Sequence, residues 1–170
     1  MARKSQADLI KEIIQTAEKH VQMAGGDEDK LLALLGAVPA DTPTVSLQFT
    51  MNTLAFDADA MKDRGKAIFE KFKKYLKIAV CDDFDYCSKE AAVDADLKKY
   101  LPDIIKKLLK HIPISGNLPK WLVTVLAWLG IQAATLDVVL AILIAWLIVK
   151  GCNELCQCKL MNDASRRPVS

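Results

Sequence analysis

The sequence has little of what enzymes usually show. It contains two histidines, His20 and His111, and neither lies in a nucleophile or metal-ligand pattern. It has no Gly-rich phosphate loop and no G-x-S-x-G or H-E-x-x-H motif. We therefore expect a protein that is not an enzyme and that needs no cofactor and no metal.

Charge excess and an export signal are also missing. Lysine and arginine number 23 against 21 aspartates and glutamates, so the net charge selects no partner. The opening residues, MARKSQADLIKEIIQTAEKH, are partly acidic and lack the apolar core of a secretory signal. The five cysteines are odd in number. These observations predict a cytosolic, reduced N-terminal part without a disulfide framework.

Apolar residues, in contrast, are concentrated near the C-terminus. From Trp121 to Val149 the chain has 29 residues, and Asp137 is the only charged one. One continuous helix over 119–150, at about 1.5 Å per residue, would be long enough to cross a bilayer. Lys120 and Lys150 bracket this segment, and its tryptophans are expected to face lipid as anchors: Trp121, Trp128 and Trp146.

Small residues and Asp137 share one face of this expected helix. At about 100° per residue they fall within an arc of about 80°, opposite the tryptophans. Small residues at this spacing allow close helix packing in lipid, and an intramembrane carboxylate typically faces a bundle interior. The pattern predicts a homo-oligomer with this stripe at its axis: Ala127, Gly130, Ala134, Asp137, Ala141 and Ala145. Alternatively, the segment is the buried central helix of a soluble bundle, with Asp137 hydrogen-bonded inside.

The residues before this segment have helical periodicity. Residues 1–112 are expected to form a helical domain, with helices over 6–24 and 58–80, another from Ser88 to Tyr100, and one with Pro102 in its first turn. Residues 45–51 alternate as in a strand, with an extended linker as the alternative. A hinge over 113–118 and a polar tail over 151–170 complete the division. The expected fold class is mainly α, with a cytosolic helical domain followed by a single transmembrane helix.

Basic residues gather between Lys62 and Lys77. This face could bind the phosphates of a nucleotide or oligonucleotide, or an anionic leaflet. Alternatively, it is a solvated face that packs near the acidic residues Asp82, Asp83 and Asp85. The candidate anion-binding residues are Lys66, Lys71, Lys73, Lys74 and Lys77.

The cysteines give no standard metal spacing. Cys152, Cys156 and Cys158 follow the apolar segment in CNELCQCKL. We expect free thiols at a helix end, or S-acylation as the alternative. Cys81 and Cys87 are too isolated in the sequence to indicate a site.

The overall arrangement resembles the small membrane effectors of bacterial anti-phage systems. The likeness is carried by a charged helical domain followed by LPKWLVTVLAWLGIQAATLDVVLAILIAWLIVKG. The resemblance implies a cytosolic domain that senses a nucleotide-type signal and controls a channel in the cytoplasmic membrane. The leading hypothesis is therefore an oligomeric channel or membrane-disrupting pore in a lipid bilayer. The alternatives are a membrane-anchored adaptor whose soluble helices bind a protein partner, and a soluble helical protein.

Overall fold

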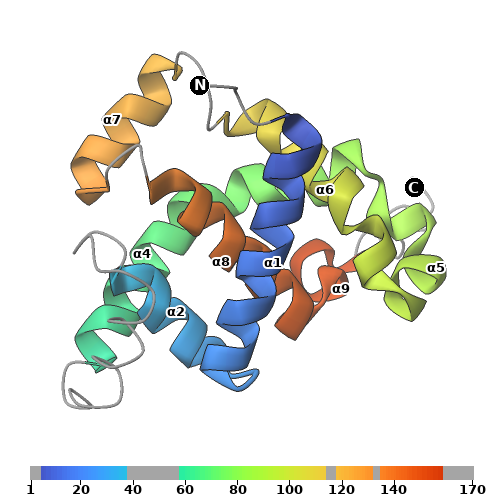
Figure 1. Cartoon of the computed structure of the whole chain (residues 1–170), viewed down its shortest axis with the longest axis horizontal. Helices are drawn as coiled ribbons and strands as arrows, with labels where there is room; N and C mark the ends of the chain where they lie inside the picture. Colours follow the sequence, from blue (N-terminus) through green and yellow to red (C-terminus); the bar gives the residue numbers. More distant parts are fainter. Residues whose placement is uncertain (1–4, 38–57, 114–117, 132–134, 159–170) are drawn as a thin grey trace, which may run out of the picture.

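The computed structural model describes residues 5–37, 58–113, 118–131 and 135–158, and every regular element in these ranges is helical (Figure 1). The sequence segment 45–51, expected to be a strand, lies outside them. The elements are α1 (Gln6–Ala24), α2 (Glu28–Ala37), α4 (Ala58–Lys77), the π-helix η3 (Ile78–Asp83), the 3-10 helix η4 (Tyr86–Ser88), α5 (Glu90–Ala95), α6 (Leu97–His111), α7 (Lys120–Leu129), α8 (Leu136–Lys150) and α9 (Cys152–Cys156).

Helix α8 forms the centre of the fold. It packs against α1 and α2, and Trp146 packs against Phe69 of α4 with ring centroids 4.9 Å apart (Figure 1). Every residue from Val139 to Leu147 is buried. A helix that is apolar all round needs an apolar partner on each side, and the neighbouring helices supply it within one chain.

The amphipathic helices explain this enclosure. The expected helix over 6–24 is confirmed as α1, which begins with Ser5 accepting a hydrogen bond from the backbone N–H of Asp8 (3.2 Å) and ends at Gly25. Its buried side chains recur at helical spacing: Ile10, Ile13, Ala17, His20 and Ala24. Helix α6 likewise buries one face, made of Leu101, Ile104, Ile105, Leu108 and Leu109.

Two glycines set the crossing of α2 and α4. A Cβ atom added to Gly36 would overlap the carbonyl oxygen of Met61, and one added to Gly65 would overlap that of Leu32. The two backbones therefore touch at this point. Any side chain at either glycine would force the helices apart, so the crossing requires glycine on both sides.

The expectation of a single long transmembrane helix over 119–150 is wrong. Helix α7 ends where Gly130 adopts a left-handed conformation (φ 73°). The backbone N–H groups of Gly130 and Ile131 donate to the carbonyls of Ala127 (3.2 Å) and Leu126 (2.9 Å), which is a Schellman ending. The apolar segment is thus divided between two helices. None of the helices in the described ranges combines the length and apolarity that a membrane crossing needs.

The boundaries expected near the middle of the chain are also corrected. Ser88 to Tyr100 is not one helix, because α5 ends at Ala95 and α6 begins at Leu97. Pro102 consequently lies within α6 and not in its first turn. The expected helix over 58–80 corresponds to α4, and the π-helix η3 continues it directly.

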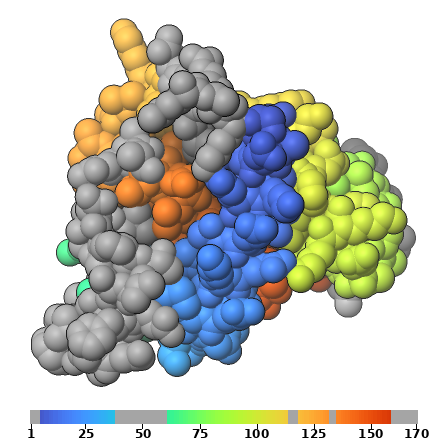
Figure 2. Space-filling model, viewed as in Figure 1, coloured from blue at the N-terminus to red at the C-terminus, as the bar shows by residue number. Residues whose placement is uncertain are grey.

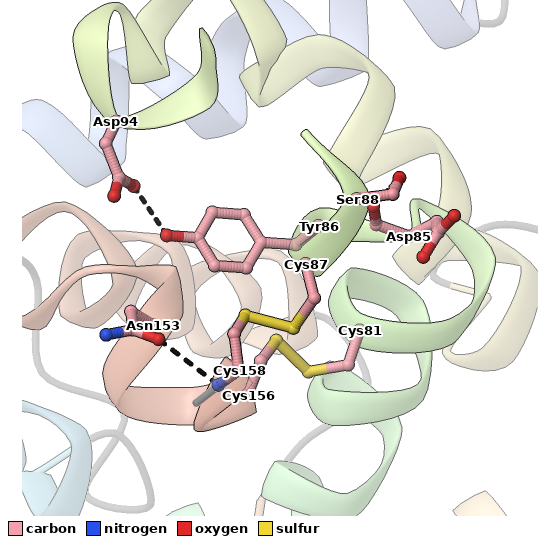
Figure 3. The surroundings of a disulfide bond; sticks show 9 residues. All are labelled: Cys81, Asp85, Tyr86, Cys87, Ser88, Asp94, Asn153, Cys156 and Cys158. Atoms are coloured by element: carbon pink, nitrogen blue, oxygen red, sulfur yellow. Dashed lines mark hydrogen bonds between the residues drawn. A yellow bond between two sulfur atoms is a disulfide. The ribbon is translucent and has the colours of Figure 1, made fainter. Parts of the chain in front are cut away.

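Four of the five cysteines form disulfides, contrary to the expectation of free thiols. Cys81 of η3 bonds to Cys156 of α9, and Cys87 of η4 bonds to Cys158 (Figure 3). Cys152 is free and buried. The two bonds lie side by side and hold the segment after α8 against the turn after α4.

Candidate interaction surface

Asp137 lies at the start of a helix and not at the centre of one. It occupies the first turn of α8, its side chain is exposed, and its Oδ1 accepts a hydrogen bond from the backbone N–H of Val138 (2.9 Å). A carboxylate is favourable here because the N-terminal end of a helix carries partial positive charge. The geometry explains how an otherwise apolar segment accommodates this charge.

The expected stripe of small residues does not form, because it required one unbroken helix. Ala127 and Gly130 are exposed at the end of α7, whereas Ala141 and Ala145 are fully buried in α8 among helices of the same chain. Ala134 lies outside the described residues. The chain's own helices therefore occupy the positions that neighbouring subunits were expected to fill at Ala141 and Ala145.

The three tryptophans have different environments. Trp146 is only 6% exposed, and Trp121 is half-buried and stacks on Tyr75 of α4 with centroids 4.4 Å apart. Trp128 is 70% exposed. Of the three expected anchors, Trp128 alone presents most of its surface to solvent.

The bracketing lysines also differ. Lys150 forms an ion pair with Glu28 (2.9 Å), and this hydrogen bond raises the pKa of the Lys150 ammonium. It ties the end of α8 to the start of α2. Lys120 is exposed at the start of α7.

The lysines of α4 lie beside aromatic rings. The ammonium of Lys71 lies 4.7 Å from the ring centroid of Trp128, and that of Lys74 lies 5.2 Å from Tyr75. Lys73 is half-buried near Phe69, at 5.9 Å. Lys66 and Lys77 are exposed. Lys71 and Lys74 therefore connect the basic side of α4 to α7, since Tyr75 stacks on Trp121.

Helix α7 has two distinct faces. Leu122 and Leu126 are buried against the protein. The opposite face is exposed along the whole helix and consists of Lys120, Val123, Thr124, Ala127 and Trp128. We call these five residues, together with Lys71 and Lys74 of α4, the α7 surface.

The α7 surface is apolar along its centre and positive at its edges. Val123 is 50% exposed, and the sequence of α7 contains no acidic residue. Lys71 to Lys77 of α4 also contains none. Figures 1 and 2 show α7 at the edge of the molecule, and the exposure of Val123 and Trp128 places its outer face in solvent. This arrangement suits contact with a partner that is both apolar and negatively charged.

The structure also contains buried titratable groups that the sequence did not indicate. His20 is fully buried; its Nδ1 donates to the carbonyl of Thr16 (2.8 Å), and its Nε2 has no hydrogen-bond partner. Burial lowers the pKa of His20, so the imidazole stays neutral at pH 7. In the sequence, only the position of His20 on the apolar face of the helix over 6–24 indicated that it would be buried.

A second buried group lies beside the disulfides. The hydroxyl of Tyr86 donates to Asp94 Oδ1 (2.6 Å), as Figure 3 shows. Burial and the nearby Asp94 raise the pKa of the Cys152 thiol to about 12. Cys152 therefore remains a protonated thiol at neutral pH, and little of the reactive thiolate form is present.

Two of the cavities border α1. A polar one of about 130 Å³ lies between α1 and Asp137, and an apolar one of about 240 Å³ lies between α1 and α6. Lys98 and Glu18, both lining the second cavity, form an ion pair (3.0 Å). No group of three or more metal-ligating side chains occurs among the residues that the structure describes.

Comparison with protein-family models, curated proteins and solved structures finds no match for this chain. Any functional interpretation therefore depends on its own residues.

Proposed function

We propose that this protein is a binding protein that docks through the α7 surface onto a negatively charged partner. One observation carries the proposal. Trp128 is 70% exposed and has the ammonium of Lys71 4.7 Å from its ring centroid. A large apolar side chain left in water beside cations is typical of residues that become buried when a partner binds.

The two disulfides support a particular place of action. Structural disulfides persist in oxidising compartments and are rare in the reduced cytosol. The sequence had indicated the cytosolic side of a membrane. The two disulfides, Cys81–Cys156 and Cys87–Cys158, favour an oxidising compartment instead.

The docking proposal is tested with three immobilised anionic partners: vesicles with anionic lipid, heparin and double-stranded DNA. The oxidised full chain should bind at least one of them, and a Lys71→Glu/Trp128→Ala variant should lose most of that binding. Lys106→Glu/Lys110→Glu on α6 is the matched control, because both lysines are exposed and lie on a different helix. Absence of binding to all three partners, or equal binding by both double variants, would contradict the proposal.

A further inference from the structure

We infer that the partner of the α7 surface is the headgroup layer of an anionic lipid bilayer, on which α7 lies parallel to the plane of the membrane. This inference rests on the proposed function and names its partner. It requires no segment that crosses the membrane.

The chemistry of the exposed face favours lipid over a polyanion. Val123 and Ala127 have no side-chain hydrogen-bonding group, so they gain nothing from phosphates or sulfates alone. They gain free energy only by leaving water for an apolar phase. The lysine ammonium groups beside these apolar side chains are instead stabilised by water and by negative charge. The headgroup region of a bilayer offers both within a few ångströms.

The side chains at the ends of the face suit this layer. Trp128 has an apolar ring with one polar N–H, and tryptophan is enriched where hydrocarbon meets headgroups. Lys71 lies over that ring, and Lys120 is exposed at the other end of the helix. Lysine side chains can place their apolar stems beside lipid while the ammonium reaches the phosphates.

The size of α7 fits contact with the surface of the membrane. Its ten residues are about 15 Å long, roughly half the hydrocarbon thickness. Its inner face packs against the protein, because Leu122 and Leu126 are buried and Trp121 stacks on Tyr75. Only the outer half of the helix can enter the bilayer, so shallow insertion follows.

Charge complementarity makes the expected binding selective. The α7 surface contains the cations Lys71, Lys74 and Lys120, and neither α7 nor the α4 segment 71–77 contains an acidic residue. Each basic residue near an anionic leaflet strengthens attraction, and salt screens it. Binding should therefore require anionic lipid and weaken as the ionic strength rises.

The experiment is sedimentation of the oxidised full chain with vesicles of phosphatidylcholine alone or mixed equally with phosphatidylglycerol. We expect partitioning into the mixed vesicles only, reduced about tenfold by Trp128→Ala because a buried aromatic side chain is lost. Lys71→Glu should also reduce it, and Lys106→Glu on α6 should not. Quenching of tryptophan fluorescence by lipids brominated near the headgroup should disappear in Trp128→Phe.

Other outcomes separate this inference from the proposed function. Binding to heparin or DNA but not to the vesicles, dependent on Trp128, would overturn the lipid inference and leave docking intact. Self-association that Trp128→Ala abolishes, without vesicle binding, would identify a second copy as the occupant and overturn it too. Equal partitioning of Trp128→Ala and the unmodified chain would also refute it. Binding to no partner would remove both proposals.

Discussion

Helices α7 and α8 come from one apolar stretch of sequence but have opposite environments. Helix α8 is buried from Val139 to Leu147, whereas α7 exposes one complete face that includes Val123 and Trp128. The difference arises from their neighbours. Helix α8 has α1, α2, α4 and α9 around it, whereas α7 buries only Leu122 and Leu126.

This contrast shows that apolar sequence alone does not identify a membrane span. An apolar helix is satisfied by lipid or by a shell of amphipathic helices, and the two give similar sequence patterns. The two cases are distinguished by how much apolar side-chain surface stays exposed to solvent after folding. The central residues of α8 expose almost none, whereas α7 exposes Val123 and Trp128. Truncating an apolar side chain should therefore affect stability differently in the two helices.

The largest effect should come from removing the disulfides that fix the segment after α8. In the chain-entropy account, the first bond closes about 75 residues and contributes about 4.5 kcal/mol. The second then closes a ring of only about ten residues and adds about 2.5 kcal/mol. We expect Cys87→Ala/Cys158→Ala to cost about 2.5 kcal/mol and loss of both bonds about 7 kcal/mol. Denaturant unfolding measures each cost.

The control for this prediction is the other pair. Cys81→Ala/Cys156→Ala should cost nearly the same as Cys87→Ala/Cys158→Ala, because either remaining bond closes the long loop. Simple additivity of the two pairs would contradict the argument. So would unfolding that is unaffected by reductant.

The next effect compares one truncation in each helix. Leu143 of α8 is fully buried, so Leu143→Ala should cost about 3 kcal/mol through lost burial and a cavity. Val123 of α7 is half exposed, and Val123→Ala should change stability by less than about 0.5 kcal/mol. Urea unfolding of both variants gives the comparison. Similar costs at the two positions would mean that α7 has a partner on its outer face.

His20 should have a smaller, pH-dependent effect on stability. It lies in α1, which packs against α8. Burial lowers the pKa of His20 in the folded state below its ordinary value of 6.5, so the unfolded chain binds the proton more readily. Stability from this residue is complete above pH 6.5 and is lost as the pH falls below it. His20→Leu should therefore raise the melting temperature more at pH 5 than at pH 8.

His111 is the control for this pH effect. It pairs with Asp83 outside the core, at 2.5 Å. A His111→Gln variant should keep the pH dependence that His20 causes. If the melting temperatures of His20→Leu and the unmodified protein change equally between pH 8 and pH 5, His20 does not gain a proton on unfolding.

A small effect is also expected at Asp137, the residue that the sequence predicted at the centre of an oligomer. Asp137→Asn removes a charge near the start of α8 while keeping an oxygen for the N–H of Val138, so we expect a cost of about 0.5 kcal/mol. Thermal unfolding measures it. A cost above about 2 kcal/mol would indicate a buried role that the exposed side chain does not suggest.

Sequence periodicity predicted the helices whose ends are marked by capping residues in the sequence itself. Helix α1 was placed correctly because Ser5 and Gly25 mark its ends and its apolar residues repeat regularly. The break at Gly130 was missed because the small residues before and after it happen to keep one helical phase.

The disulfides and the α7 surface could not be predicted in the same way. Cys81 and Cys156 are separated by 75 positions, and only the fold brings them together. Trp128 was identified as a residue that faces outward, together with Trp121 and Trp146. The positions of α4 and α8 determine that Trp128 alone remains exposed, and this depends on contacts that single-helix periodicity does not contain.

The paired disulfides also make part of the chain a covalent ring. Helices α5, α6, α7 and α8 all lie between Cys87 and Cys156, so they belong to the ring, whereas α1 and α2 lie outside it. A protease that cut the exposed helix α7 once would open the ring without releasing either fragment. The protein can thus be nicked in α7 and still keep α8 tethered to the rest of the molecule.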